Sequence, residues 1–231
     1  MKTKILIAAL LSLSTLTAFA DNCSVEGHHS GNSYFGEINC TNVTLSALTA
    51  RGELTVSKAI VNGQTDVIGE ITGAYLTVNG AFSTHGEVNV NHLSVTGPTG
   101  VHGQLGVSSG ILHATTVYGA LNASNTTFDD IKVFGRASIQ DSKINGNLTL
   151  LTKWSVLNGT SVNNIVVTKS IFAPTQIICL EKASHVTGNI TFESGQGTIY
   201  TIGTSKIDGT VIGAKVVQGE CPHKGQFTIQ S

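Results

Sequence analysis

The sequence predicts an all-β protein: a single-stranded, right-handed parallel β-helix (β-solenoid) with three short strands in each coil of roughly 16 or 17 residues. Three observations support this fold class. A glycine recurs at a nearly constant spacing, and the residues that follow it form columns of one chemical character. The composition is rich in glycine (26 residues) and poor in proline (3 residues), which favours strands joined by tight turns.

The recurring glycine defines the coil. It stands at Gly36, Gly52, Gly69, Gly86, Gly103, Gly119 and Gly135. The third residue of each segment is apolar or small, at Ile38, Leu54, Ile71, Val88, Leu105, Leu121 and Ala137. The tenth residue is apolar in every copy, at Leu45, Val61, Val78, Val95, Leu112, Phe128 and Ile144. Because side chains alternate along a strand, each coil should have one face in a dry interior and one in water.

A polar residue follows the tenth position and a glycine often comes next, as in Asn62-Gly63 and Asn79-Gly80. We expect a sharp corner there, with the glycine in a conformation of positive φ. All segments repeat in the same order at a fixed period, which stacked parallel coils explain better than hairpins. An antiparallel sandwich or barrel is the alternative.

The chain divides into four parts. We expect a signal peptide at residues 1–20, an N-terminal cap at 21–35, regular coils at 36–150, and irregular coils with a C-terminal cap at 151–231. Beyond Leu150 the period weakens, and a loop is expected around Phe172-Ala173-Pro174. The cap matters because an open end of a solenoid offers unpaired backbone groups to another chain.

The first twenty residues predict export. Lys2 and Lys4 precede an apolar run from Ile5 to Leu16, and the segment ends with Ala18-Phe19-Ala20, which is typical of a secretory signal peptide. The run is too short to span a bilayer, so we expect no membrane insertion. The mature protein is therefore expected in the periplasm or outside the cell.

Charge and cysteine content narrow the partners and the compartment. The formal net charge is -1 and charged residues make up 12%, so nucleic-acid partners are not expected. The four cysteines lie in the exported part, which predicts two disulfides. Three pairings are possible, and clustering near the two ends favours Cys23 with Cys40 and Cys179 with Cys221.

Two columns carry possible chemistry. The second position of the repeat holds Glu37, Glu53, Glu70 and Glu87, and the position before the glycine holds His85 and His102. The columns should face the same side, so Glu70, Glu87, His85 and His102 are candidate ligands of a divalent metal ion. The alternative is a solvated acidic stripe beside a stack of aromatic and imidazole rings, without a cofactor. We find no HExxH, CxxC or phosphate-binding loop and predict no catalytic residue.

The repeats GELTVSKAIVNGQTDVI, GEITGAYLTVNGAFSTH and GEVNVNHLSVTGPTGVH resemble those of bactofilins, the polymer-forming β-helical proteins of bacteria. The resemblance covers residues 36–150 and implies a triangular β-helix that polymerises end to end without nucleotide. Bactofilins are typically cytoplasmic and lack disulfides, so the signal peptide and the cysteines are departures from that pattern.

Together these observations predict an exported structural or interaction protein, acting as a scaffold, in adhesion or in surface assembly. Its partners would be further copies of the chain, in a homo-oligomer or filament joined through the β-helix ends, or a cell-surface or polysaccharide partner. The alternative is a carbohydrate-active β-helix enzyme, a polysaccharide lyase or hydrolase. A hexapeptide-repeat acyltransferase is a more distant alternative, because its coil length and catalytic histidine are not evident.

Overall fold

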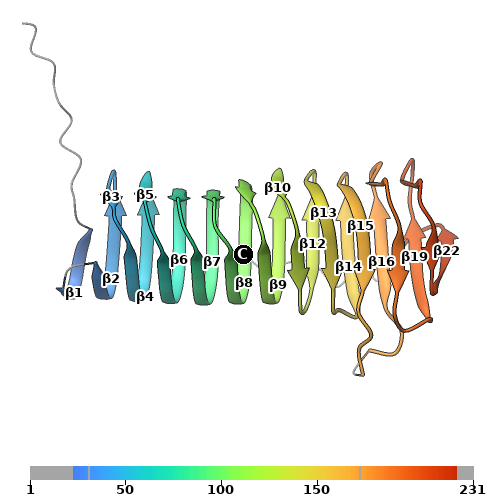
Figure 1. Ribbon diagram of the computed structural model, residues 1–231, viewed down its shortest axis with the longest axis horizontal. Coiled ribbons are helices and arrows are strands. Elements are labelled where there is room, and N and C mark those ends of the chain that lie inside the picture. Colours follow the sequence, from blue (N-terminus) through green and yellow to red (C-terminus); the bar gives the residue numbers. More distant parts are fainter. Residues whose placement is uncertain (1–22, 31, 172, 223–231) are drawn as a thin grey trace, which may run out of the picture.

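The computed structural model describes residues 23–30, 32–171 and 173–222 (Figure 1). In this part of the chain all of the regular secondary structure is β-strand. The strands stack side by side along a straight rod. The stack is a parallel β-solenoid of about 11 turns, which confirms the predicted fold class. The predicted signal peptide, residues 1–20, lies outside the described residues. Within them, no helix has the length and apolar character that crossing a membrane requires.

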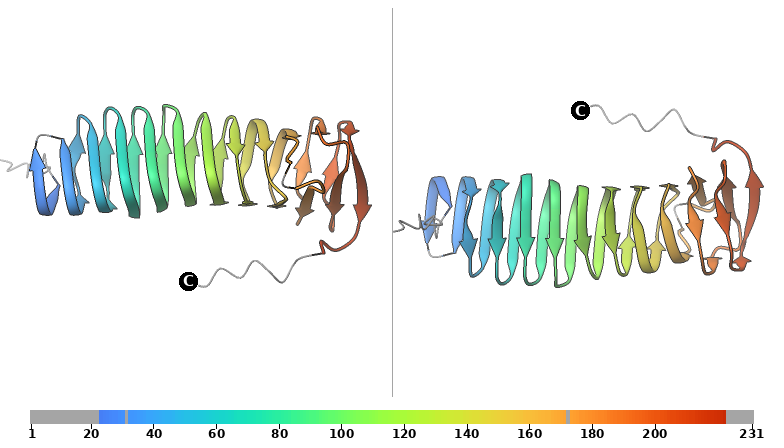
Figure 2. Two further views of the ribbon diagram at one scale, coloured as in Figure 1. Left: turned by 90° about the horizontal axis from the view of Figure 1, so that it is seen from below. Right: turned by 90° about the horizontal axis from the view of Figure 1, so that it is seen from above.

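The strands follow one another along the rod in chain order (Figures 1 and 2). Those before residue 150 are β1 (Ser24–Ser30), β2 (Ser33–Thr41), β3 (Thr44–Leu45), β4 (Leu48–Ser57), β5 (Ala59–Val61), β6 (Thr65–Val78), β7 (Phe82–Val95), β8 (Thr99–Leu112), β9 (Thr115–Ser124), β10 (Thr126–Phe128), β11 (Ile131–Val133), β12 (Ala137–Gln140) and β13 (Lys143–Leu150). The later ones are β14 (Trp154–Asn158), β15 (Ser161–Val167), β16 (Ile177–Glu181), β17 (His185–Val186), β18 (Ile190–Phe192), β19 (Gly197–Thr201), β20 (Lys206–Ile207), β21 (Val211–Ile212) and β22 (Ala214–Gln218).

Residues one period apart lie directly over each other. Leu54 pairs with Ile71, and Ile71 pairs with Val88, in parallel register. All three side chains are fully buried. The apolar column predicted from the sequence is therefore the core of the stack.

Each coil has three faces, and the side chains alternate between the interior and solvent on all of them. In the coil that begins at Gly86, Val88 and Val90 point inward from the first face, and Leu93 and Val95 from the second. Thr99 and Val101 point inward from the third face. The interior is thus apolar but not wholly so, because threonines occupy inward positions on the third face.

The repeating glycine forms the corner between the third and first faces, which we name the glycine corner. The seven glycines from Gly36 to Gly135 have φ between +102° and +151°, a region that other residues rarely adopt. The stacking adds a second requirement. A Cβ atom on Gly86 would collide with the backbone carbonyl oxygen of Gly69 in the coil below. Both backbone conformation and space therefore require glycine at this corner.

The corner between the second and third faces, the polar corner, differs from our prediction. Gly63, Gly80 and Gly97 do not have positive φ, so the expected reason for glycine is wrong. Glycine is needed there because a Cβ on Gly80 would collide with the backbone of Gly63. These glycines also explain the two coil lengths. The longer coils have a glycine at the polar corner, whereas the coils that are shorter by one residue turn without a glycine, as at His113-Ala114.

The stack continues beyond residue 150 with longer connections. Val156 pairs with Cys179, Cys179 with Tyr200, and Tyr200 with Val217. The connection between β15 and β16, described at 168–171 and 173–176, lengthens one coil and protrudes from the rod in Figure 1, at the place where the sequence predicts a loop. Insertions at corners therefore hide the period from the sequence without interrupting the parallel pairing.

Candidate functional site

The residues before the repeating glycine form a ladder of stacked rings along the glycine corner. The rings of His85 and His102 are parallel to within 2°, with centroids 4.5 Å apart. Tyr118 follows at 4.5 Å from His102, and Phe134 at 4.8 Å from Tyr118. The spacing between strands sets these distances. Because each ring covers the face of the next, the inner rings present mainly their edges to solvent.

The glutamate column lies beside this ladder. Glu53 pairs in register with Glu70, and both are exposed. Further along the column, Glu87 Oε1 accepts a hydrogen bond of 2.8 Å from Gln104 Nε2, its partner in register. The described residues contain no group of three or more His, Cys, Asp or Glu side chains arranged to hold a metal ion. The structure confirms the stack of rings, while metal binding by Glu70, Glu87, His85 and His102 stays a prediction.

The polar corner carries a second ladder, made of hydrogen-bonded side chains. Asn79 Nδ2 donates to Asn62 Oδ1 at 3.0 Å. Further along, His113 Nδ1 lies 2.5 Å from Asp129 Oδ2, and Asn145 Nδ2 donates to Asp129 Oδ1 at 3.3 Å. The hydrogen bond with His113, followed by that with Asn145, lowers the pKa of the Asp129 carboxyl.

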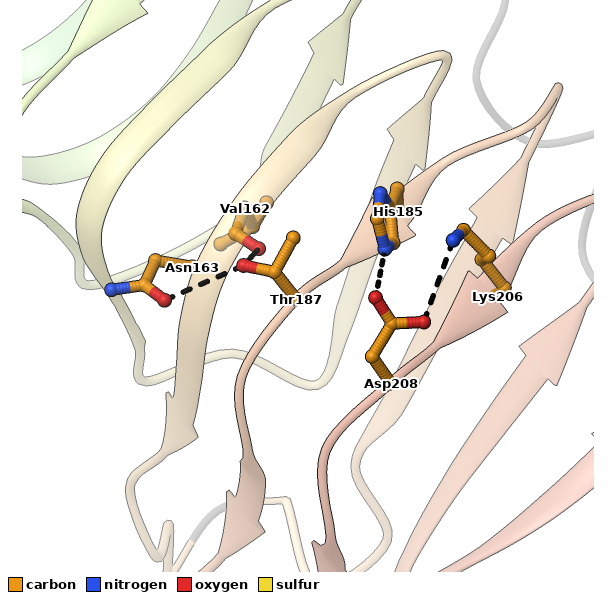
Figure 3. Close-up of polar contacts among 6 residues, drawn as sticks. All are labelled: Val162, Asn163, His185, Thr187, Lys206 and Asp208. Carbon is orange, nitrogen blue, oxygen red and sulfur yellow. Dashed lines mark hydrogen bonds and ion pairs between the residues drawn. The ribbon is translucent and has the colours of Figure 1, made fainter.

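The same ladder reaches the irregular coils (Figure 3). Asp208 lies between His185, whose Nε2 is 2.6 Å from Oδ2, and Lys206, whose Nζ is 3.5 Å from Oδ1. The hydrogen bond with His185 is the main reason why the pKa of Asp208 is lowered. The nearby Thr187 hydroxyl donates to Asn163 Oδ1 and to the Val162 carbonyl, both at 3.4 Å, so it is directed away from His185. This group is therefore a structural contact rather than a nucleophile–base pair.

A third set of contacts, next to the polar corner, joins side chains to the backbone of the following coil. Asp130 Oδ1 accepts a 2.7 Å hydrogen bond from the backbone N–H of Asn147. Asn164 Oδ1 accepts one from Asn189 and Asn189 Oδ1 one from Thr210, both at 2.9 Å. Polar residues at this corner are expected to satisfy backbone groups of the neighbouring coil, and the structure shows this role at Asp130, Asn164 and Asn189.

At the N-terminal end of the rod, which we call the sealed end, the apolar interior is covered. β1 lies antiparallel to β2 and covers the first coil, and the Cys23–Cys40 disulfide ties its start to that coil. The inward side chains of the first coil are buried, with exposed fractions of 0% for Tyr34 and Ile38 and 2% for Leu45. Ser33–Phe35 belong to β2 and pair in parallel with Thr49–Arg51, so they form part of the first coil.

Within the residues that the structure describes, the C-terminal end is open. β22 pairs with β19 on one side, and no described strand pairs with its other edge. Val216 occupies the inward position above Ile199, but it is 50% exposed whereas Ile199 is 0% exposed. Ile207 and Val211, inward on the other two faces, are also only partly buried. The Cys179–Cys221 disulfide leads the chain from β22 back towards β16, away from the open end.

Two grooves mark the sides of the rod. One, of about 400 Å³, lies on the third face beside the polar corner and is lined by Thr116, Asp130, Lys132, Asn147 and Thr149 among others. It coincides with two consecutive coils of the shorter kind, whose tighter corners recess the surface. The other, of about 210 Å³, lies on the second face between the ring pair Tyr75–His92 and the side chain of Ile111.

Comparison with protein-family models, curated proteins and solved structures finds no match to this chain. The resemblance to bactofilins therefore stays a prediction.

The structure brings some of the predicted residues together and not others. Both predicted disulfides are formed, with Cα atoms 4.4 Å apart for Cys23–Cys40 and 6.1 Å apart for Cys179–Cys221. His85 and His102 are in contact, and Glu70 belongs to the exposed glutamate column. The unequal ends of the rod are the feature that sequence analysis did not anticipate.

Proposed function

We propose that this chain is an exported structural protein that acts by assembly through the C-terminal end of its β-solenoid. Two disulfides favour an oxidising environment, and the predicted signal peptide supplies the route to the periplasm or the cell exterior. The observation that carries the proposal is the contrast between a sealed end and an open one.

The open end has the properties of an unfinished interface. In the last coil, Val216 leaves half of its side-chain surface in water at a position that is fully buried one coil earlier. Among the described strands, the outer edge of β22 has no partner. Backbone N–H and C=O groups on such an edge readily pair with a strand from another chain. Covering this end would bury apolar surface and satisfy backbone hydrogen bonds at the same time.

A second copy of the chain is the partner that this end fits. Two identical open ends can meet about a two-fold axis, with β22 pairing antiparallel to its counterpart, because a two-fold interface uses the same patch on both partners. At the N-terminal end, the inward side chains that the structure describes in the first coil, Tyr34, Ile38 and Leu45, are already covered. Assembly through the open end therefore joins rods in pairs, whereas an end-to-end filament would also need the sealed end.

The test is the mass of the mature, oxidised protein in solution. Light scattering after size-exclusion chromatography should show a dimer, and negative-stain images should show rods of twice the single length. Val216→Asp places a charge in the proposed interface and should give monomers. Because Val216 is already half exposed in the isolated chain, this variant should keep the circular dichroism of the wild type.

Ile171→Asp is the matched control. Ile171 is the most exposed large apolar residue of the described chain, at 84%, and it lies in the connection between β15 and β16, away from the end. It should leave the dimer intact. A wild-type protein that stays monomeric at every concentration, or a Val216→Asp variant that assembles like the wild type, would contradict assembly through this end.

No specific observation favours the carbohydrate-active enzyme. Glycoside cleavage commonly uses a pair of carboxylates on either side of the bond. Of the two grooves described above, the larger is lined by one carboxylate, Asp130, and the smaller by none. Asp130 is also engaged by the backbone N–H of Asn147.

A further inference from the structure

A short ladder of rings on the corner between the first and second faces stops after two coils. Tyr75 and His92 stack with centroids 4.4 Å apart and planes inclined by 22°. The next residue in this register is Ser109, which pairs with His92 across β7 and β8. A hydroxymethyl group therefore stands where a third ring would continue the stack.

The contrast with the glycine corner shows what is missing. There, His102 is covered on both faces, by His85 and by Tyr118. At His92, Tyr75 covers one face, and the opposite face of the imidazole is directed along the rod towards Ser109. The space beside this position belongs to the groove of about 210 Å³ that His92, Ser109 and Ile111 help to line.

The walls of the groove suit a flat apolar group. Ile111, one of its walls, is 55% exposed, and Tyr75 is 48% exposed. Neighbouring strands are about 4.8 Å apart, which is also the distance at which one aromatic ring stacks on another. A ring at the level of Ser109 would thus lie in contact with the imidazole of His92 and keep the spacing of the ladder. The hydroxyl groups of Ser94 and Ser109 lie in the same lining and could bond a polar substituent on that ring.

We propose that this groove is a binding site for one planar aromatic ring, stacked on His92 above Ser109 and flanked by Ile111. The ring could belong to a free small molecule or to an aromatic side chain of a peptide. The site is on the side of the rod, far along the stack from β22, so it is independent of assembly through the C-terminal end.

The test is nuclear magnetic resonance of the mature protein with labelled histidines. Titration with p-cresol should shift the ring signals of His92 in a saturable way, because a ring stacked on the imidazole imposes its ring current. His185, which lies on the second face near the C-terminal end, should not shift and acts as an internal reference. Cyclohexanol, similar in size but not planar, should leave His92 unchanged.

Variants at Ser109 distinguish specific binding in this groove from nonspecific binding to apolar surface. Ser109→Tyr supplies the missing ring from the chain itself, so the free variant should show His92 signals resembling those of the p-cresol-saturated wild type. Its affinity for p-cresol should fall by about tenfold or more, the loss expected when a stacking contact is blocked. Ser109→Ala keeps the space above His92, so it should still give a saturable shift of His92 with p-cresol. Ser109→Leu is a second way to fill the groove if Ser109→Tyr does not fold.

The peptides Gly-Tyr-Gly and Gly-Leu-Gly identify the source of the ring. A response to both p-cresol and Gly-Tyr-Gly means that the ring alone is recognised, and a response to Gly-Tyr-Gly only means that the site takes a side chain; both outcomes support the proposal, provided that Gly-Leu-Gly gives no response. His92 signals that respond to neither ring compound, or that respond equally in wild type and in the two filled variants, overturn it.

Discussion

Replacing Gly86 by alanine tests the physical basis of the coil. Gly86 lies at the glycine corner with φ of +144°, and a Cβ there would collide with the carbonyl oxygen of Gly69. Gly100 offers a matched control in the neighbouring strand. It has no positive φ, and a Cβ added to it would meet no atom within 4 Å.

The two substitutions should differ by a large fraction of a domain's stability. Alanine in a strained conformation of positive φ costs on the order of 1–3 kcal/mol. The collision with a backbone atom adds to this, because a carbonyl group fixed in the ladder of strands cannot rotate away as a flexible side chain could. We expect Gly86→Ala to lower the free energy of unfolding by about 3 kcal/mol or more, and Gly100→Ala to change it by less than about 0.5 kcal/mol.

Thermal denaturation of the oxidised mature protein, followed by circular dichroism, measures the difference. For a chain of this size, about 3 kcal/mol corresponds to a fall in the melting temperature of roughly 6–12 °C. Gly100→Ala should melt within a few degrees of the wild type. Equal melting temperatures for Gly86→Ala and Gly100→Ala would refute the claim that the corner requires glycine.

Three further changes test the core, a charged contact and a disulfide. Val78→Asp places an unpaired charge in the interior and should unfold the stack, whereas Thr77→Asp, on the solvent side of the same strand, should not; circular dichroism distinguishes them. His113 lowers the pKa of Asp129, so this contact stabilises the fold above the unfolded value of about 3.9 and is lost as the pH falls through the lower folded value. The stability difference between wild type and Asp129→Asn should therefore shrink below about pH 4, and a difference that is constant with pH would contradict this. Replacing Cys23 and Cys40 by alanine removes a link across 17 residues and should cost about 3 kcal/mol in chemical denaturation, and a far smaller loss would show that β1 is held by its strand pairing alone.

The regular part of the fold could be predicted because its information is local and repeated. A side chain such as Ile71 is inward for the same reason in every coil, so seven copies of the pattern average out the exceptions at single positions. The disulfide pairing could be predicted as well, because cysteines near each end have partners within a few coils. The fold prediction needed only the period and the alternation of side chains, and the disulfide prediction needed only the positions of the cysteines and the expected export.

The polar corner shows where local reasoning failed. From the sequence, Asn79-Gly80 is typical of a turn with positive φ. In the stack, Gly80 is required by the backbone of Gly63, which lies 17 positions earlier and becomes a neighbour only after the coil is closed. Contacts of this kind come from the register between coils, which a motif of two residues does not contain.

The difference between the two ends of the rod could not be predicted from the sequence for a similar reason. Whether Val216 is buried depends on whether another coil is stacked on it, and its own segment, Ala214–Gln218, has the pattern of a normal coil strand. The two disulfides have opposite effects. Cys23–Cys40 links the covering strand β1 to the first coil, whereas Cys179–Cys221 directs the chain that follows β22 away from the last coil. A solenoid built in this way runs from a closed end to an open one, so its function is most directly sought at the last coil, where the repeat ends without a cap among the described residues.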